Sequence, residues 1–99
     1  MPNLLLENLR KNRAYIYAIA EKYGISNIRI FGSVARGEET AKSDVDMLVS
    51  ISKHKGMGFD LIRFEREFSE KFNTKTDVIS ENGVHASLKE KIFNEAVAL

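Results

Sequence analysis

The sequence predicts an α+β fold, an α/β sandwich in which helices pack on a small mixed sheet. Two observations support this expectation. Apolar residues recur at spacings of three and four in long segments, as they do along one face of a helix. Between these segments lie short runs rich in β-branched and aromatic residues, bounded by polar or glycine-containing turns. The expected order of elements is α-β-α-β-α-β-α.

The first helix is expected over Leu4 to Tyr23. Its apolar stripe consists of Leu6, Leu9, Ile16, Ala20 and Tyr23. Asn3 can act as the N-cap, and Gly24 stands where a left-handed residue often ends a helix. The pattern therefore predicts one amphipathic helix, with its spacing interrupted at Arg13.

One strand is expected before a glycine turn and another after it. The run from Ile28 to Phe31 ends at Gly32, which indicates a strand followed by a tight turn into a short helix. The segment from Asp44 to Ile51 is the clearest strand, because its residues alternate between two faces. One face would carry Val45, Met47, Val49 and Ile51, and the other Asp44, Asp46, Leu48 and Ser50.

The second half of the chain alternates in the same way. We expect a polar loop at 53–58, a helix at 59–72, a strand at 76–79, a turn at 80–83 and a closing helix. The helix at 59–72 would face the core with Leu61, Phe64, Phe68 and Phe72. The closing helix would face it with Leu88, Ile92, Ala96 and Leu99.

The bulk composition predicts one small domain, residues 1–99, in the cytoplasm. The net charge of +1 gives no basis for expecting binding to nucleic acid or to an anionic membrane. The absence of cysteine excludes disulfides and thiolate metal sites, and it fits a reducing compartment. The amino terminus has no signal-peptide pattern, and no apolar run approaches the roughly 20 residues needed to span a bilayer.

A turn of small residues is the first part of the predicted functional site. Gly32 and Ser33 follow an apolar run, and Arg36 and Gly37 close a short turn after them. A small-residue turn between a strand and a helix exposes backbone N–H groups that can hold phosphate oxygens. This turn therefore predicts a phosphate site.

Three carboxylates are the second part. Asp44 and Asp46 are two residues apart on a strand, so they point to the same face and can share a divalent cation. Asp77 lies on the next expected strand. Converging carboxylates could hold one or two Mg²⁺ ions, which neutralise triphosphate charge and activate an attacking hydroxyl. The reaction class that follows is in-line attack on the α-phosphate of a nucleotide, with pyrophosphate leaving.

Each half of this pattern is weak evidence by itself, because Asp marks many strand ends and Gly-Ser is common in turns. The combination is much stronger. Six residue types are specified at fixed spacing, and each occurs by chance at roughly one position in 15 to 20. Coincidence is therefore rarer than about one in a million per starting position.

The segment from Gly32 to Gly37, followed after six residues by Asp44-Val45-Asp46, resembles the signature of the minimal nucleotidyltransferases of the DNA polymerase β-like superfamily. The resemblance covers nearly the whole chain. Asp77 stands in the place of the family's third catalytic acid, and residues 88–97 resemble its closing helix.

The resemblance implies a role for each matching residue. Ser33 and the preceding glycine backbone would contact the β- and γ-phosphates of ATP. Asp44 and Asp46 would ligate both metal ions. Asp77 would ligate the catalytic metal and help to deprotonate the acceptor hydroxyl. Arg36 would orient the turn or touch a phosphate.

The resemblance also implies a partner. Members of this family are commonly encoded beside an all-helical HEPN toxin, a ribonuclease, and silence it by transferring AMP from ATP to a tyrosine hydroxyl. A chain of 99 residues has no room for a further domain that would bind the acceptor. We therefore expect a partner protein, or a second copy of the chain in a homo-oligomer, to complete the acceptor side.

Two alternatives stay open at this point. The chain could be a non-catalytic module that binds a nucleotide or caps a toxin without turnover. It could also be a metal-dependent phosphohydrolase or nuclease, since two-metal carboxylate sites serve hydrolysis as well.

Overall fold

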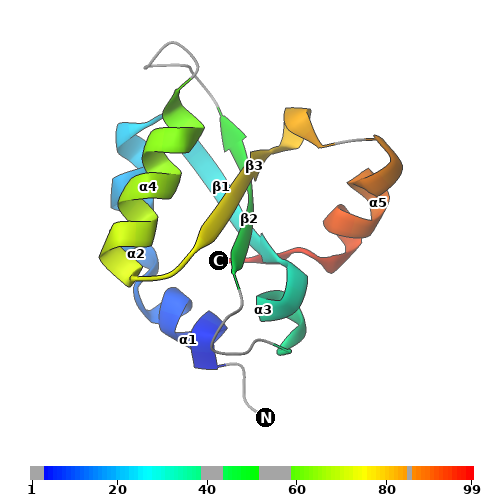
Figure 1. Cartoon of the computed structure of the whole chain (residues 1–99), viewed down its shortest axis with the longest axis horizontal. Coiled ribbons are helices and arrows are strands. Elements are labelled where there is room, and N and C mark those ends of the chain that lie inside the picture. Colours follow the sequence, from blue (N-terminus) through cyan, green and yellow to red (C-terminus); the bar gives the residue numbers. More distant parts are fainter. Residues whose placement is uncertain (1–3, 39–43, 52–58, 85) are drawn as a thin grey trace.

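The computed structural model describes residues 4–38, 44–51, 59–84 and 86–99 (Figure 1). Its centre is a four-stranded sheet with the strand order β3-β2-β1-β4. The strands are β1 (Ile25–Phe31), β2 (Val45–Ile51), β3 (Thr76–Ser80) and β4 (Val97–Ala98). β1 runs antiparallel to both β2 and β4, whereas β2 and β3 are parallel. The sheet is thus mixed, and the predicted α+β class is confirmed.

Five α-helices and one 3-10 turn surround the sheet within the described residues. They are α1 (Leu4–Lys11), α2 (Arg13–Lys22), α3 (Gly32–Arg36), α4 (Asp60–Phe72), η1 (Glu81–Gly83) and α5 (Ala86–Glu95). In Figure 1, α2 and α4 stand together on one side of the strands, and α5 stands on the other. Among the described helices, none is long and apolar enough to cross a membrane.

The core lies between the sheet and the pair α2 and α4. Strand β2 contributes Val45, Met47 and Val49, which are fully buried and pack with Phe64 and Phe68 of α4. Because side chains alternate along a strand, the residues between them point to the opposite face. The predicted division of β2 into two faces is therefore confirmed, and the carboxylates lie on the side away from the main core.

The single first helix of the prediction is wrong. The structure has two helices, α1 and α2, which are separated at Asn12. Asn12 has φ −100° and ψ 16°, and its side-chain Nδ2 donates to the carbonyl of Asn8 at 2.8 Å. Asn side chains often compete with helical backbone bonds in this way. At the other end Gly24 has φ 68°, as expected for a left-handed residue, whereas the predicted N-cap Asn3 lies outside the described residues.

The prediction for the closing helix is wrong at its end. Helix α5 stops at Glu95, and the residues after it form β4, whose Val97 pairs with Ile30 of β1. The backbone N–H of Leu99 then donates to the carbonyl of Ile28 at 3.1 Å. The edge of β1 offers hydrogen-bond partners to these residues, and pairing with it satisfies backbone groups of both segments. The apolar residues near the end of the chain thus belong to a strand edge.

The other elements agree with their predictions within a few residues. β1 begins three residues earlier than expected, and β3 ends one residue later. The turn at 80–83 is the 3-10 turn η1, in which the hydroxyl of Ser80 accepts a hydrogen bond from the N–H of Gly83. Of the apolar residues expected on α4, two are buried and two pack partly buried against the core: Leu61, Phe64, Phe68 and Phe72. The loop predicted at 53–58 lies outside the described residues.

Candidate active site

The turn after β1 lies directly against a carboxylate of β2. Gly32 has φ 76°, a conformation that side chains other than hydrogen rarely adopt. A Cβ atom on Gly32 would lie 2.2 Å from the Oδ2 atom of Asp46, well inside van der Waals contact. The absence of a side chain therefore allows the turn backbone and the Asp46 carboxylate to share one small space. The short helix α3 follows at once and ends at Gly37, which has φ 72°.

The sheet brings the predicted carboxylates together. Asp46 and Asp77 are direct partners in the parallel register of β2 and β3, so their side chains leave the same face at neighbouring positions. Asp44 immediately precedes β2 and lies two residues from Asp46, on the same face. Asp44 and Asp46 are half-buried, and Asp77 is exposed. Two adjacent strands and the turn thus meet at one end of the sheet.

The electrostatics of this end are strongly negative. The pKa of the Asp46 carboxyl is raised from 3.8 to about 6, first by burial and then by the nearby carboxylates of Asp77, Asp44 and Glu95. The guanidinium of Arg36 opposes this rise. A bound cation lowers the repulsion among neighbouring carboxylates, so it stabilises such a cluster more than it stabilises an isolated carboxylate. The site is therefore suited to a positively charged ligand.

The donor set fits Mg²⁺ by its chemistry. Within the described ranges, no group of three or more His, Cys, Asp or Glu side chains is placed to hold a metal ion by itself. Mg²⁺ does not require such a cage, because it commonly takes one or two carboxylates and completes its shell with phosphate oxygens and water. Asp44 and Asp77 offer hard carboxylate oxygens close enough to Asp46 to raise its pKa. The three side chains therefore supply the kind of ligand that Mg²⁺ prefers.

Arg36 and Glu95 form a contact that sequence reasoning missed. The Nε atom of Arg36 donates to Glu38 at 2.6 Å, and its Nη1 atom donates to Glu95 at the end of α5. The resemblance to the minimal nucleotidyltransferases implied only that Arg36 would orient the turn or touch a phosphate. Nothing in the motif points to Glu95, because 59 residues separate it from Arg36 and the contact depends on how α5 packs.

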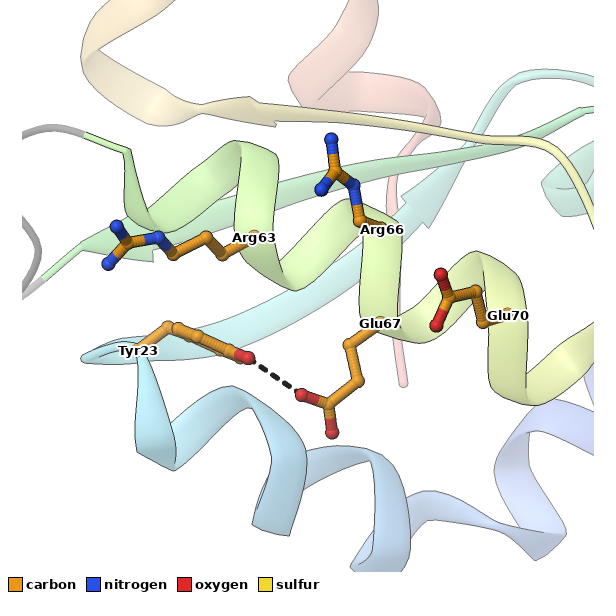
Figure 2. A pocket seen from close by; sticks show the side chains of 5 residues that line it. All are labelled: Tyr23, Arg63, Arg66, Glu67 and Glu70. Atoms are coloured by element: carbon orange, nitrogen blue, oxygen red, sulfur yellow. Dashed lines mark hydrogen bonds between the residues drawn. The ribbon is translucent and has the colours of Figure 1, made fainter.

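The hollow shown in Figure 2 has a different character. It is lined by Tyr23, Arg63, Arg66, Glu67 and Glu70, none of which is a predicted site residue (Figure 2). Tyr23 donates to Glu67 at 2.6 Å, and Lys22 donates to the other oxygen of Glu67 at 2.7 Å. These bonds lower the pKa of Glu67, and they link α2 to α4. We interpret this cluster as a clamp between two helices. A separate hollow, between α4 and β3, reaches Asp77.

The raised pKa of Asp46 leads to a prediction about stability. The pKa of Asp46 is higher in the folded chain than in the unfolded chain. Its contribution to stability is therefore fully present when the pH is below the unfolded pKa, and it is lost as the pH rises through the folded pKa of about 6. One pKa unit corresponds to about 1.4 kcal/mol, and solvent screening at this half-buried site reduces the effect. We therefore expect Asp46→Asn to raise the free energy of unfolding of the metal-free protein by about 1–2 kcal/mol at pH 7.5.

Urea unfolding of wild type and Asp46→Asn at pH 7.5 and at pH 4.5 measures this effect. The difference between the two proteins should shrink as the pH falls, because wild-type Asp46 becomes protonated. Glu7→Gln, which removes an exposed carboxylate from α1, is the control for the loss of one negative charge. A difference that is the same at both pH values would contradict the assignment.

Comparison with known proteins gives consistent matches over most of the chain. The nucleotidyltransferase domain family matches residues 13–99. A Methanocaldococcus jannaschii protein described as a candidate protein adenylyltransferase is 38% identical over 90 residues, which cover 91% of this chain and 96% of that protein. The match therefore spans the turn and all three carboxylates.

Solved structures share the fold. A structure described as a candidate minimal nucleotidyltransferase has a TM-score of 0.80 at 33% identity, with 95% of each chain covered. A chain from the complex of a tri-AMPylated Shewanella oneidensis HEPN toxin with its MNT antitoxin has a TM-score of 0.65 at 12% identity. That match covers 90% of this chain and 69% of the other, and at such identity it shows a common fold only.

Proposed function

This chain belongs to the nucleotidyltransferase domain family, and from that premise we propose that it transfers AMP from ATP to a tyrosine hydroxyl of an all-helical HEPN toxin, as an antitoxin. The observation that carries the proposal is the register pair Asp46 and Asp77 beside the Gly32 turn. This pairing brings two carboxylates together beside a turn backbone that has no side chain, which supports a site for a metal ion and a phosphate. The relative described as a candidate protein adenylyltransferase supports a protein as the acceptor.

The reaction is a displacement at the α-phosphorus of ATP. The acceptor oxygen forms a new bond to that phosphorus, the bond from the phosphorus to the bridging oxygen breaks, and pyrophosphate leaves. The hydroxyl proton passes to a base. Asp44, Asp46 and Asp77 would bind Mg²⁺ together with phosphate oxygens and water, and the ion would neutralise phosphate charge and lower the pKa of the acceptor hydroxyl.

Other residues of the chain would bind the phosphates and accept the proton of the hydroxyl. The backbone at Gly32 and the side chain of Ser33 would hold the outer phosphates, and the close approach of the turn to Asp46 supports this role. Of the three carboxylates, only that of Asp77 is exposed, and it lies on β3, a strand at one edge of the sheet. An acceptor that arrives from solvent would therefore meet Asp77 first, which makes it the group best placed to receive the proton.

The test is incubation with the HEPN partner, Mg²⁺ and ATP that carries its label on either the α- or the γ-phosphate. We expect label on the partner from α-labelled ATP alone, with release of pyrophosphate. Asp77→Asn should lower this labelling by about a hundredfold, the loss typical of removing one group that acts in the transition state. Glu70→Gln, an exposed carboxylate on α4, is the control and should retain wild-type labelling.

Two outcomes would contradict the proposal. Release of free AMP without a labelled partner would indicate a phosphohydrolase. Neutralisation of the toxin with no labelling, unaffected by Asp44→Ala, would indicate a module that caps the toxin without turnover.

A further inference from the structure

Helix α5 is attached to the protein by polar contacts. None of its residues, from Ala86 to Glu95, is buried, and the side chains of Leu88 and Phe93 are exposed. A helix that buries so little apolar surface gains little from the hydrophobic effect. Its described contacts include the ion pair between Arg36 and Glu95 and the guanidinium of Arg29, 5.5 Å from the ring centroid of Phe93. Charged contacts therefore contribute to holding α5 against the rest of the protein.

The Arg36–Glu95 pair joins α5 to the element that forms the phosphate turn. Arg36 ends α3, the five-residue helix that begins at Gly32. The side chain of Glu95 is 16% exposed, whereas that of Glu38, the other partner of Arg36, is 64% exposed. The side chain of Arg36 is 46% exposed, so water reaches the guanidinium in both ion pairs. Glu38 and Glu95 thus hold the guanidinium together, and Glu95 is the partner that connects it to a distant element, the end of α5.

This pair also lies close to the carboxylate cluster. The charges of Arg36 and Glu95 both act on Asp46, in opposite directions, so both side chains stand near the site at the end of β2. The guanidinium has five N–H donors in a rigid plane. Among the described residues, its bonds to Glu38 and Glu95 use the Nε atom and one hydrogen of Nη1, and its other N–H groups have no acceptor in that part of the chain.

We infer that Glu95 is a positioning residue of the active site: by holding Arg36, it directs the remaining N–H groups of the guanidinium toward the triphosphate of bound ATP. This role rests on the proposed function, because it requires ATP at the Gly32 turn. A long side chain that is fixed before the ligand arrives loses less conformational freedom on binding. The planar fork of arginine also suits phosphate oxygens once its orientation is set.

A role for Glu95 in holding Arg36 away from ATP predicts the opposite change in ATP affinity. If Glu95 held Arg36 away from the phosphates, its removal would free the guanidinium and tighten ATP binding. If Glu95 positions Arg36, its removal weakens binding. The sign of the change in ATP affinity therefore decides between the two roles.

The experiment is a calorimetric titration of Mg²⁺-ATP into the full chain. Glu95→Gln keeps the size of the side chain and removes its charge, and we expect about tenfold weaker binding, within the range seen when a supporting contact is lost. Glu95→Asp keeps the charge and should recover part of the affinity. Glu90→Gln removes an exposed carboxylate from the same helix and should bind like wild type.

A double-mutant cycle connects the effect to Arg36. Arg36→Gln should weaken binding, and adding Glu95→Gln to it should change affinity by less than about twofold, because the contact is already gone. In the AMP-transfer assay, Glu95→Gln should raise the KM for ATP about tenfold and leave kcat within about twofold of wild type. Unchanged thermal unfolding of Glu95→Gln would show that loss of folding is not the cause.

Three results would overturn the inference. Equal or tighter binding by Glu95→Gln excludes the positioning role and leaves the proposed function intact. An equal loss on adding Glu95→Gln to wild type and to Arg36→Gln shows that Glu95 does not act through Arg36. A wild-type chain that does not bind Mg²⁺-ATP overturns both the positioning role and the proposed function.

Discussion

Asp46→Asn is expected to lower the rate of AMP transfer by at least about a hundredfold. Asp46 occupies the centre of the site, with the Gly32 turn on one side and Asp77 on the adjacent strand. Asparagine has almost the same shape, so the fold is preserved while the negative oxygen that can hold a cation is lost. The loss should appear mainly in kcat, because the interaction strengthens as charge develops on the leaving pyrophosphate.

Single-turnover labelling of the HEPN partner with α-labelled ATP measures this rate. Ser50→Ala is a suitable control, because Ser50 lies on the same face of β2 near its other end. The expected stabilisation of metal-free Asp46→Asn at pH 7.5 separates loss of chemistry from loss of folding. A variant that is more stable and yet retains a tenth or more of the wild-type rate would contradict a central role for Asp46.

The meeting of the turn and the carboxylates could be predicted from the sequence for a simple reason. Alternation along a strand decides which face a side chain takes, and Asp46 and Asp77 sit on that pattern in two neighbouring strands. Gly32 precedes the strand pair at a point where the chain must turn. The face that a side chain takes and the position of a turn depend on few residues, so the spacing of residues in the sequence is enough to predict both.

The contact between Arg36 and Glu95 could not be predicted in the same way. It depends on where α5 ends and on the pairing of Val97 with β1, and both follow from tertiary structure. The apolar residues of the final segment fit a helical stripe as well as a strand edge, so spacing could not decide between them. Likewise, the break at Asn12 follows from one side-chain hydrogen bond that leaves the apolar spacing almost unchanged.

Gly32→Ala is expected to impair both folding and catalysis. The left-handed backbone at φ 76° costs a residue with a Cβ atom about 1–2 kcal/mol. The new methyl group would also meet Asp46 Oδ2 at 2.2 Å, so the carboxylate or the turn has to move. Because displacements of about 1 Å at a reacting centre can cost about a hundredfold in rate, we expect a comparable loss of AMP transfer.

Gly24→Ala separates these two causes. Gly24 has φ 68°, so alanine there carries a similar backbone cost at the end of α2, on the side of the sheet away from the carboxylates. Urea unfolding should show the backbone cost in both variants and a further loss in Gly32→Ala from the contact with Asp46, and only Gly32→Ala should lose AMP transfer. If both variants lost activity equally, backbone strain would account for the effect. If neither did, the close approach of the turn to Asp46 would have no part in catalysis.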